Sequence, residues 1–232
     1  MTEPRAIIFD LDDTLYPQRR FAQSGLAAVA DVVACDVGVP REEVVALLRD
    51  ARRFAPGREL QFLCSRFGLP DSDVERLVNI VRAHWPDIRL PLETVRVLGA
   101  LRPGWRIGVL TNGLADTQRR KVAALGLTAL VDAVLFAAEC GDGRGKPDPA
   151  PFVAILAELR VPASRAVFVG DDLDADIIGA MRVGMRAIHV ERDGWRGVSR
   201  TGVRPDARVP SLGSVLRVAE RLVKGDQRVH AA

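Results

Sequence analysis

Three carboxylates follow a short apolar segment near the start of the chain. Residues 6–9 read as a buried strand, and the run of residues 10–13 that follows contains three aspartates. Like charges this close repel one another unless a cation or hydrogen-bond donors offset the repulsion. In an extended segment residues i and i+2 point the same way, so Asp10 and Asp12 can face one pocket. The spacing is typical of a divalent-metal site in which one carboxylate attacks and the other moves a proton, and a turn or helix cap is the structural alternative.

The composition is that of a globular protein. The chain has 232 residues, of which 48% are hydrophobic, and this length suits one large domain or a core with a modest insertion. The chain has no uncharged apolar run of about 18 residues, and its first residues do not resemble a signal peptide, so we expect a cytoplasmic protein without a membrane partner. The formal charge is +3, and no basic tract is longer than Arg119-Arg120-Lys121. A solvated surface, rather than a nucleic-acid site, is therefore expected.

Cysteine and lysine are both rare in this chain. Three cysteines are widely spaced and form no CxxC pair: Cys35, Cys64 and Cys140. They are expected to be reduced, mostly buried thiols without a zinc site or a disulfide framework. Almost all basic residues are arginine, and the lysines are Lys121, Lys146 and Lys224. Each lysine is informative, because a compact ammonium stands where this chain ordinarily has a guanidinium.

The elements that must position these residues fall into two parts. After a strand over residues 5–10, the pattern from 17 to 91 is helical, with apolar stripes over 21–33, 42–54, 60–67 and 74–85, the last after an Asp71 cap. From residue 93 onward helices and strands alternate. The expected strands are 106–111, 133–136, 166–170 and 186–190, and the expected helices are 115–125, 151–159, 175–183 and 212–223.

Apolar strands separated by amphipathic helices predict a parallel sheet that is covered on both faces. The predicted fold is therefore α/β, a Rossmann-like doubly wound parallel sheet core with an inserted all-α cap domain. The core comprises residues 1–16 and 92–232, and the cap comprises residues 17–91. We expect Phe54 and Trp85 to lie in the core of the cap. The polar residues of the cap are more simply an exposed helical face than substrate contacts: Gln18, Arg19, Arg20, Arg52, Arg53 and Arg58.

Polar residues follow each predicted strand, where the ligand crevice of an open parallel sheet lies. The second strand ends in Thr111 and Asn112, followed by a glycine whose N–H can approach an anion closely. A loop with two prolines presents Lys146, and the fourth strand leads into a cluster of acids: Asp171, Asp172, Asp174 and Asp176. This set suits phosphoryl transfer with Mg²⁺. Zinc hydrolysis and a serine triad are disfavoured, because the histidines are scattered and no nucleophile elbow is present.

The order of elements and these four motifs resemble the haloacid dehalogenase-like (HAD) hydrolase superfamily, with the helical cap inserted after the first strand as in its first cap class. The resemblance covers essentially the whole chain up to the last helix. It implies that Asp10 is the nucleophile that forms an aspartyl-phosphate, and that Asp12 protonates the leaving alcohol and then activates water. It also implies that Mg²⁺ is held by Asp10, the backbone carbonyl of Asp12 and Asp171.

The resemblance also implies roles for the remaining motif residues. Thr111 and Asn112 bind the phosphate, and Lys146 offsets the charge on Asp10 and the phosphoryl group. The loop over residues 139–146 is longer than the commonest form in the superfamily, so the approach of Lys146 to the site is an expectation for the structure to test.

Four further aspartates surround these motifs. By the same resemblance, Asp176 orients Lys146 or a metal-bound water. Asp172 either assists the metal or caps the following helix. Asp13 and Asp148 are assigned to structure, as turn or capping residues.

Asp12 also separates two branches of the superfamily. The true dehalogenases of the superfamily lack an acidic residue at the position of Asp12, because a halide ion leaves without needing a proton. The predicted function is a Mg²⁺-dependent phosphatase, monomer or homodimer, for a small phosphorylated metabolite of the nucleotide, sugar phosphate or phosphoglycolate type. The alternatives are a phosphosugar mutase, a 2-haloacid dehalogenase and a degenerate regulatory protein. A signalling receiver is disfavoured, since its phosphorylated aspartate follows the third strand and no aspartate lies between Phe136 and Gly141 here.

Overall fold

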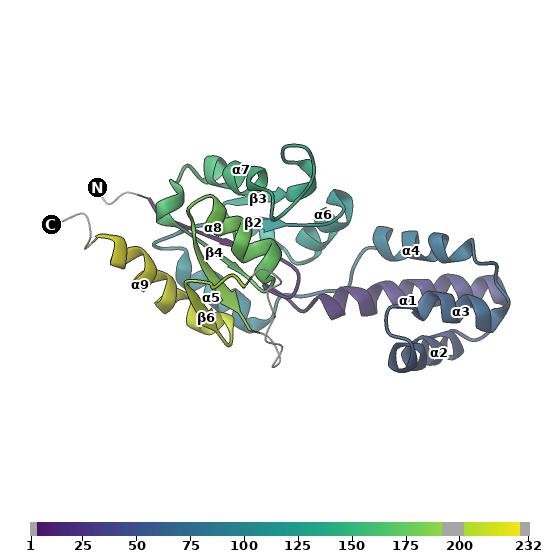
Figure 1. The fold of residues 1–232 in the computed structure, drawn as a ribbon. Helices are drawn as coiled ribbons and strands as arrows, with labels where there is room; N and C mark the ends of the chain where they lie inside the picture. The colour runs from purple at the N-terminus through teal and green to yellow at the C-terminus, as the bar shows by residue number, and fades with distance from the viewer. Residues whose placement is uncertain (1–3, 192–201, 228–232) are drawn as a thin grey trace. The chain divides into compact units, whose positions relative to one another are not determined.

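The computed structural model describes residues 4–191 and 202–227. The chain divides into two compact units (Figure 1). One unit combines Met1–Pro17 with Arg89–Ala232, and the other is Gln18–Ile88. In the described residues, no helix combines the length and apolar content that crossing a lipid bilayer requires.

The first unit is built on a six-stranded parallel sheet. Its strands are β1 (Ala6–Phe9), β2 (Arg106–Thr111), β3 (Ala133–Phe136), β4 (Ala166–Gly170), β5 (Arg186–Val190) and β6 (Ala207–Val209). They are ordered β3-β2-β1-β4-β5-β6, and every pair is parallel. This order confirms the predicted Rossmann-like sheet. The edge strand β6 was not predicted, because three residues are too few to show an alternating pattern.

Helices alternate with the strands, and the last helix follows β6. They are α5 (Leu92–Leu101), α6 (Ala115–Ala124), α7 (Pro149–Leu159), α8 (Ile178–Arg182) and α9 (Val215–Gln227). Helix α7 begins two residues before the predicted start, because the Asp148 carboxylate accepts a hydrogen bond from the Ala150 N–H at 2.9 Å and Pro149 fits the first turn. The helix predicted over 175–183 is instead a π-helical turn, η4 (Leu173–Ile177), that continues into α8.

The sheet is buried on both faces, which explains its near-continuous apolar sequence. All four residues of β1 are fully buried. Ile8 and Phe168 share one face with residues of α7 and α8. On that face the rings of Phe152 and Phe168 meet edge to face, with centroids 5.1 Å apart. Successive residues of a strand point to opposite faces, so Ile7 and Phe9 lie on the other side of the sheet.

The second unit is all-helical. It contains α1 (Gln18–Val37), α2 (Arg41–Phe54), α3 (Glu59–Phe67) and α4 (Asp73–Ala83), around a core that includes Val33, Leu48, Leu63 and Leu77. The prediction that Phe54 and Trp85 lie in this core is wrong, because they are 83% and 68% exposed. Phe54 is the last residue of α2 and Trp85 follows the end of α4, so neither lies within the stretch that faces the core.

Two smaller predictions also fail. Asp71 does not cap α4: the residue before the helix is Ser72, and no side-chain capping bond forms there. The cysteines are free, as expected, but only Cys64 is buried; Cys140 is half-buried and Cys35 is exposed.

Truncation of Phe152 tests the packing of α7 on the sheet. We expect Phe152→Ala to lower the free energy of unfolding by about 3 to 5 kcal/mol, because a fully buried aromatic ring is replaced by a cavity. The neighbouring residue Val153 is 54% exposed, so Val153→Ala should change stability by no more than about 0.5 kcal/mol. Urea denaturation of both variants measures the difference, and equal effects would contradict the packing described.

Candidate active site

A buried lysine joins the acids that follow two strands. The Lys146 ammonium donates hydrogen bonds to Asp10 Oδ1 at 2.6 Å, to Asp176 Oδ1 at 2.7 Å and to the Leu110 carbonyl at 3.0 Å. The Asp10 N–H donates to the Val169 carbonyl at 2.9 Å, which extends the pairing of β1 with β4 and places Asp10 beside the acids after β4. The predicted approach of Lys146 to Asp10 is thus present in the structure, in spite of the long loop.

Asn112 holds the backbone of Lys146 in place. Its Oδ1 accepts a hydrogen bond from the Lys146 N–H at 2.8 Å, and its Nδ2 donates to the Lys146 carbonyl at 3.0 Å. The preceding residue, Gly145, has φ +72°, and a Cβ there would lie 2.9 Å from Asn112 Oδ1. The contacts with Lys146 use the side-chain oxygen and one of the two side-chain N–H donors, so the backbone N–H and the second side-chain N–H of Asn112 are left to support the predicted contact with phosphate.

The turn after β4 orders the second group of acids. The Asp172 carboxylate accepts hydrogen bonds from the Asp174 and Ala175 N–H groups, both at 2.8 Å, so this side chain caps η4. Asp176 Oδ2 accepts from the Asp172 N–H at 3.2 Å. A Cβ on Gly170 would lie 2.2 Å from that oxygen, so glycine is required there for Asp176 to reach Lys146. π-Helical turns of this kind are frequent at functional sites.

Three carboxylates lie close enough to share a metal ion. Oxygens of Asp10, Asp171 and Asp176 all lie within 4.8 Å of one another. Asp176 already accepts hydrogen bonds on both oxygens, which leaves Asp10 and Asp171 as the better ligands. Carboxylate oxygens are the ligands that Mg²⁺ prefers. The donor set therefore fits the predicted ion, and Asp176 fits the predicted role beside Lys146.

The electrostatics of the cluster favour a cation. Burial, together with the negative charge of Asp10, raises the pKa of Asp171 to about 7. Burial also raises the pKa of Asp10, and the Lys146 ammonium opposes this by favouring the charged carboxylate. For Lys146, burial lowers the pKa, but the attraction of Asp10 and Asp176 outweighs it, so the pKa is raised and the ammonium stays charged.

Asp12 makes a set of contacts separate from those of Asp10. Its carboxylate accepts hydrogen bonds from the Tyr16 hydroxyl at 2.6 Å and from the Gln118 amide at 2.9 Å, and it forms an ion pair with Lys121. The Gln118 amide also donates to Thr111 Oγ1 at 2.5 Å. The prediction that Lys121 belongs to a solvated basic surface is wrong, because the residue is 4% exposed.

Several residues of the site were missed in the sequence. Thr14 donates to Asp171 Oδ1 at 3.2 Å, and the buried His189 ring lies 2.9 Å from the Asp171 carbonyl. Gln118 and Lys121 had a detectable signal, since lysine is rare in this chain and the two lie at helical spacing just after Thr111. The sequence contains no signal for His189, because a histidine within an apolar strand is most often a core residue.

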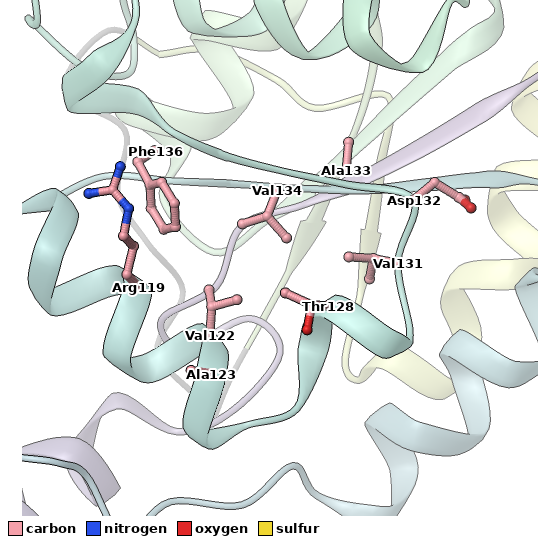
Figure 2. Close-up of a pocket in the computed structure, with 9 residues that line it drawn as sticks. All are labelled: Arg119, Val122, Ala123, Thr128, Val131, Asp132, Ala133, Val134 and Phe136. Carbon is pink, nitrogen blue, oxygen red and sulfur yellow. The ribbon is translucent and has the colours of Figure 1, made fainter.

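A hollow lies elsewhere on this unit. It has a volume of about 510 Å³ and lies between α6 and β3, lined by Arg119, Val122, Thr128, Val131 and Phe136 among others (Figure 2). The Arg119 guanidinium lies over the Phe136 ring at 4.8 Å and is paired with Glu139. The hollow contains none of the clustered carboxylates or Lys146, so the chemistry is placed at the strand ends instead.

The chain belongs to a known family of hydrolases. Residues 4–184 match the model of the haloacid dehalogenase-like hydrolase family. Fold, strand-end carboxylates and family agree, and the site described above is therefore the candidate active site of a hydrolase.

Named relatives narrow the comparison. The chain is 27% identical to a glyceraldehyde 3-phosphate phosphatase of Methanopyrus kandleri. The alignment spans 238 residues and covers 95% of this chain and 99% of that protein. It is 34% identical to a ribulose-1,5-bisphosphate 5-phosphatase of Halopiger xanaduensis, over 79% of this chain and 83% of that protein. Among solved structures, a 2-haloacid dehalogenase of Pseudomonas syringae pv. Tomato DC3000 superimposes with a TM-score of 0.65 and 30% identity, over 94% of this chain and 99% of that one.

Removal of the Lys146 ammonium tests the charge balance of the cluster. Lys146→Met leaves Asp10 and Asp176 without their shared cation, and we expect the free energy of unfolding to fall by about 3 to 5 kcal/mol, as when one partner of a buried ion pair is removed. The double variant Lys146→Met/Asp176→Asn should recover part of this loss, because one uncompensated charge is gone. Urea denaturation without divalent cations gives both values. A double variant no more stable than Lys146→Met would show that charge compensation is not what Lys146 supplies.

Proposed function

We propose that this chain is a Mg²⁺-dependent phosphatase that hydrolyses a small phosphorylated metabolite, of the nucleotide, sugar phosphate or phosphoglycolate type, through an aspartyl-phosphate on Asp10. The observation that carries the proposal is the buried contact of Asp10 with Lys146, next to the Asp171 carboxylate and the end of β2. The curated relatives described above are named as phosphatases of small phosphorylated metabolites, which supports the proposal. We further propose that the unit Gln18–Ile88 serves as the cap and that the protein acts in the cytoplasm.

The proposed reaction has two halves. In the first, an Asp10 carboxylate oxygen attacks phosphorus, the bond to the leaving oxygen breaks, and the Asp12 carboxyl gives its proton to that oxygen. In the second, Asp12 takes a proton from water as the water oxygen attacks phosphorus, and the bond to Asp10 breaks. Each turnover thus releases one alcohol and one phosphate and returns Asp12 to its protonated form.

Other groups stabilise charge during these steps. Lys146 lies against Asp10 and offsets the negative charge that gathers on the phosphoryl oxygens. The Thr111 hydroxyl and the Asn112 N–H are proposed to bind those oxygens at the end of β2. Mg²⁺, when bound, would neutralise phosphoryl oxygens, and Asp10, Asp171 and the backbone carbonyl of Asp12 would hold it.

A phosphate-release screen tests the function. The protein is assayed with small phosphorylated metabolites in Mg²⁺ and again in EDTA, with Asp10→Asn as the control. We expect Mg²⁺-dependent release by the wild type and none by the variant, because an amide of the same shape cannot act as the nucleophile. Circular dichroism should show that the variant remains folded. Turnover by Asp10→Asn at the wild-type rate would refute the nucleophile, and wild-type protein without turnover on any substrate would refute the phosphatase.

Truncation of Asp12 tests its acid role. We expect Asp12→Ala to lower the rate by about 10²- to 10⁴-fold for an alkyl phosphate, the usual contribution of general acid–base catalysis. The second-order rate constant for an aryl phosphate should fall much less, since a phenolate leaves without a proton. Steady-state kinetics on both substrates measures the two losses, and equal losses would argue against the acid role.

A 2-haloacid dehalogenase is the second candidate, because the solved structure at 30% identity has that name. Displacement of halide also needs a nucleophilic carboxylate, but it needs no proton donor. The Asp12 carboxylate and the three donors that surround it would then have no chemical use. Halide release from 2-haloacids, measured beside phosphate release, separates the two candidates.

A further inference from the structure

Lys121 is placed unlike a surface lysine. Its side chain is 4% exposed, and its ammonium lies 2.9 Å from Asp12 Oδ1 and 2.8 Å from Asp12 Oδ2. A buried ammonium is unfavourable unless it is paired and hydrogen-bonded, and lysine is among the residues least often buried. The contact with both carboxylate oxygens therefore accounts for the position of this side chain.

The Asp12 carboxylate accepts four hydrogen bonds, although its side chain remains 20% exposed. Oδ1 accepts hydrogen bonds from Tyr16 and Lys121, and Oδ2 accepts from Gln118 and Lys121. A carboxylate offers about four acceptor positions. The hydrogen bonds from these donors occupy the acceptor positions of the Asp12 carboxylate and fix its rotation. Asp12 must therefore release one donor before it can give a proton to a substrate.

Helix α6 supplies two of these donors from one face. Gln118 and Lys121 are three residues apart and therefore lie on the same side of the helix. The two residues between them do not share this environment: Arg119 is exposed and pairs with Glu139, and Arg120 is half-buried. Since Gln118 also contacts Thr111, α6 joins the proposed proton-transfer group to the end of β2.

We propose that Lys121 is a positioning residue for Asp12, which holds the carboxylate where it serves both proton transfers of the reaction. The inference rests on the proposed phosphatase function. Lys121 does not touch the reacting phosphorus in this scheme and acts only through Asp12. The ammonium stabilises the carboxylate that remains after Asp12 has given its proton to the leaving oxygen, and it keeps that carboxylate in place to accept a proton from the attacking water.

This role has a kinetic signature. The ratio kcat/KM reports only the first half of the reaction, up to release of the alcohol, whereas kcat also includes the attack of water. An aryl phosphate needs no proton in the first half but needs Asp12 in the second. A positioning residue for Asp12 is therefore required for kcat/KM with an alkyl phosphate, and not with an aryl phosphate.

The test compares Lys121→Met with the wild type on both substrates in saturating Mg²⁺. We expect kcat/KM for the alkyl phosphate to fall by about 10- to 100-fold, a part of what general acid–base catalysis contributes. For the aryl phosphate, kcat and KM should fall together, so that kcat/KM is retained. Lys121→Gln, which keeps one neutral donor, should show the same pattern to a smaller extent and is the second variant if Lys121→Met does not fold.

Two comparisons isolate the contact. In an Asp12→Ala background, Lys121→Met should cause no further loss with the aryl phosphate, because the residue through which Lys121 acts is absent. Arg120→Met, which removes a cation from the neighbouring position of α6, should retain the wild-type constants for both substrates.

The outcomes separate this inference from the function on which it rests. Equal loss of kcat/KM for both substrates in the Lys121 variants, or a further loss in the Asp12→Ala background, would overturn the positioning role while the phosphatase stands. A wild-type protein that releases no phosphate from either substrate would overturn the phosphatase itself, and with it this role.

Discussion

A single ammonium buried among carboxylates is the interaction on which the site depends. Lys146 uses all three of its N–H donors on Asp10, Asp176 and a backbone carbonyl. Two carboxylates on one ammonium leave a net negative charge, and the nearby Asp171 adds to it. Negative charge in a buried site is relieved either by protonation, which the raised pKa of Asp171 reflects, or by a further cation. The same arrangement that holds the nucleophile in place therefore also favours a divalent cation beside it.

The order of the strands makes this contact possible. β1 lies between β2 and β4, so Asp10, Thr111 and Asp171 lie at the carboxyl ends of three adjacent strands although they are far apart in the sequence. Lys146 reaches the group because the Asn112 side chain holds its backbone. Helix α6 contacts both Asp12 and Thr111 through Gln118. Two lysines thus contact two carboxylates that are two residues apart, one for the proposed nucleophile and one for the proposed proton-transfer group.

The sheet and the strand-end acids could be predicted because they follow from short-range rules. Apolar runs mark buried parallel strands, and the ends of such strands meet at one edge. The rarity of lysine singles out Lys121, but short-range rules do not predict its burial. Its neighbours Arg119 and Arg120 suggest a charged surface, and which face of α6 is covered depends on a contact with Asp12, more than 100 positions away. The hydrogen bonds between the Asn112 side chain and the Lys146 backbone could not be predicted either, because they join residues 34 positions apart. The exposure of Phe54 depends on where α2 ends relative to its partners, which the hydrophobic pattern does not specify.

The central claim is that Asp10 takes the phosphoryl group, and the most direct measurement locates that group. The protein is quenched in acid during turnover of an aryl phosphate, and the labelled peptide is identified by mass spectrometry. The account predicts a phosphate on Asp10 that hydroxylamine removes, as for an acyl phosphate, and none in Asp10→Asn. A phosphate that hydroxylamine does not remove, on a serine, threonine or histidine, would contradict it, as would turnover without any covalent phosphate.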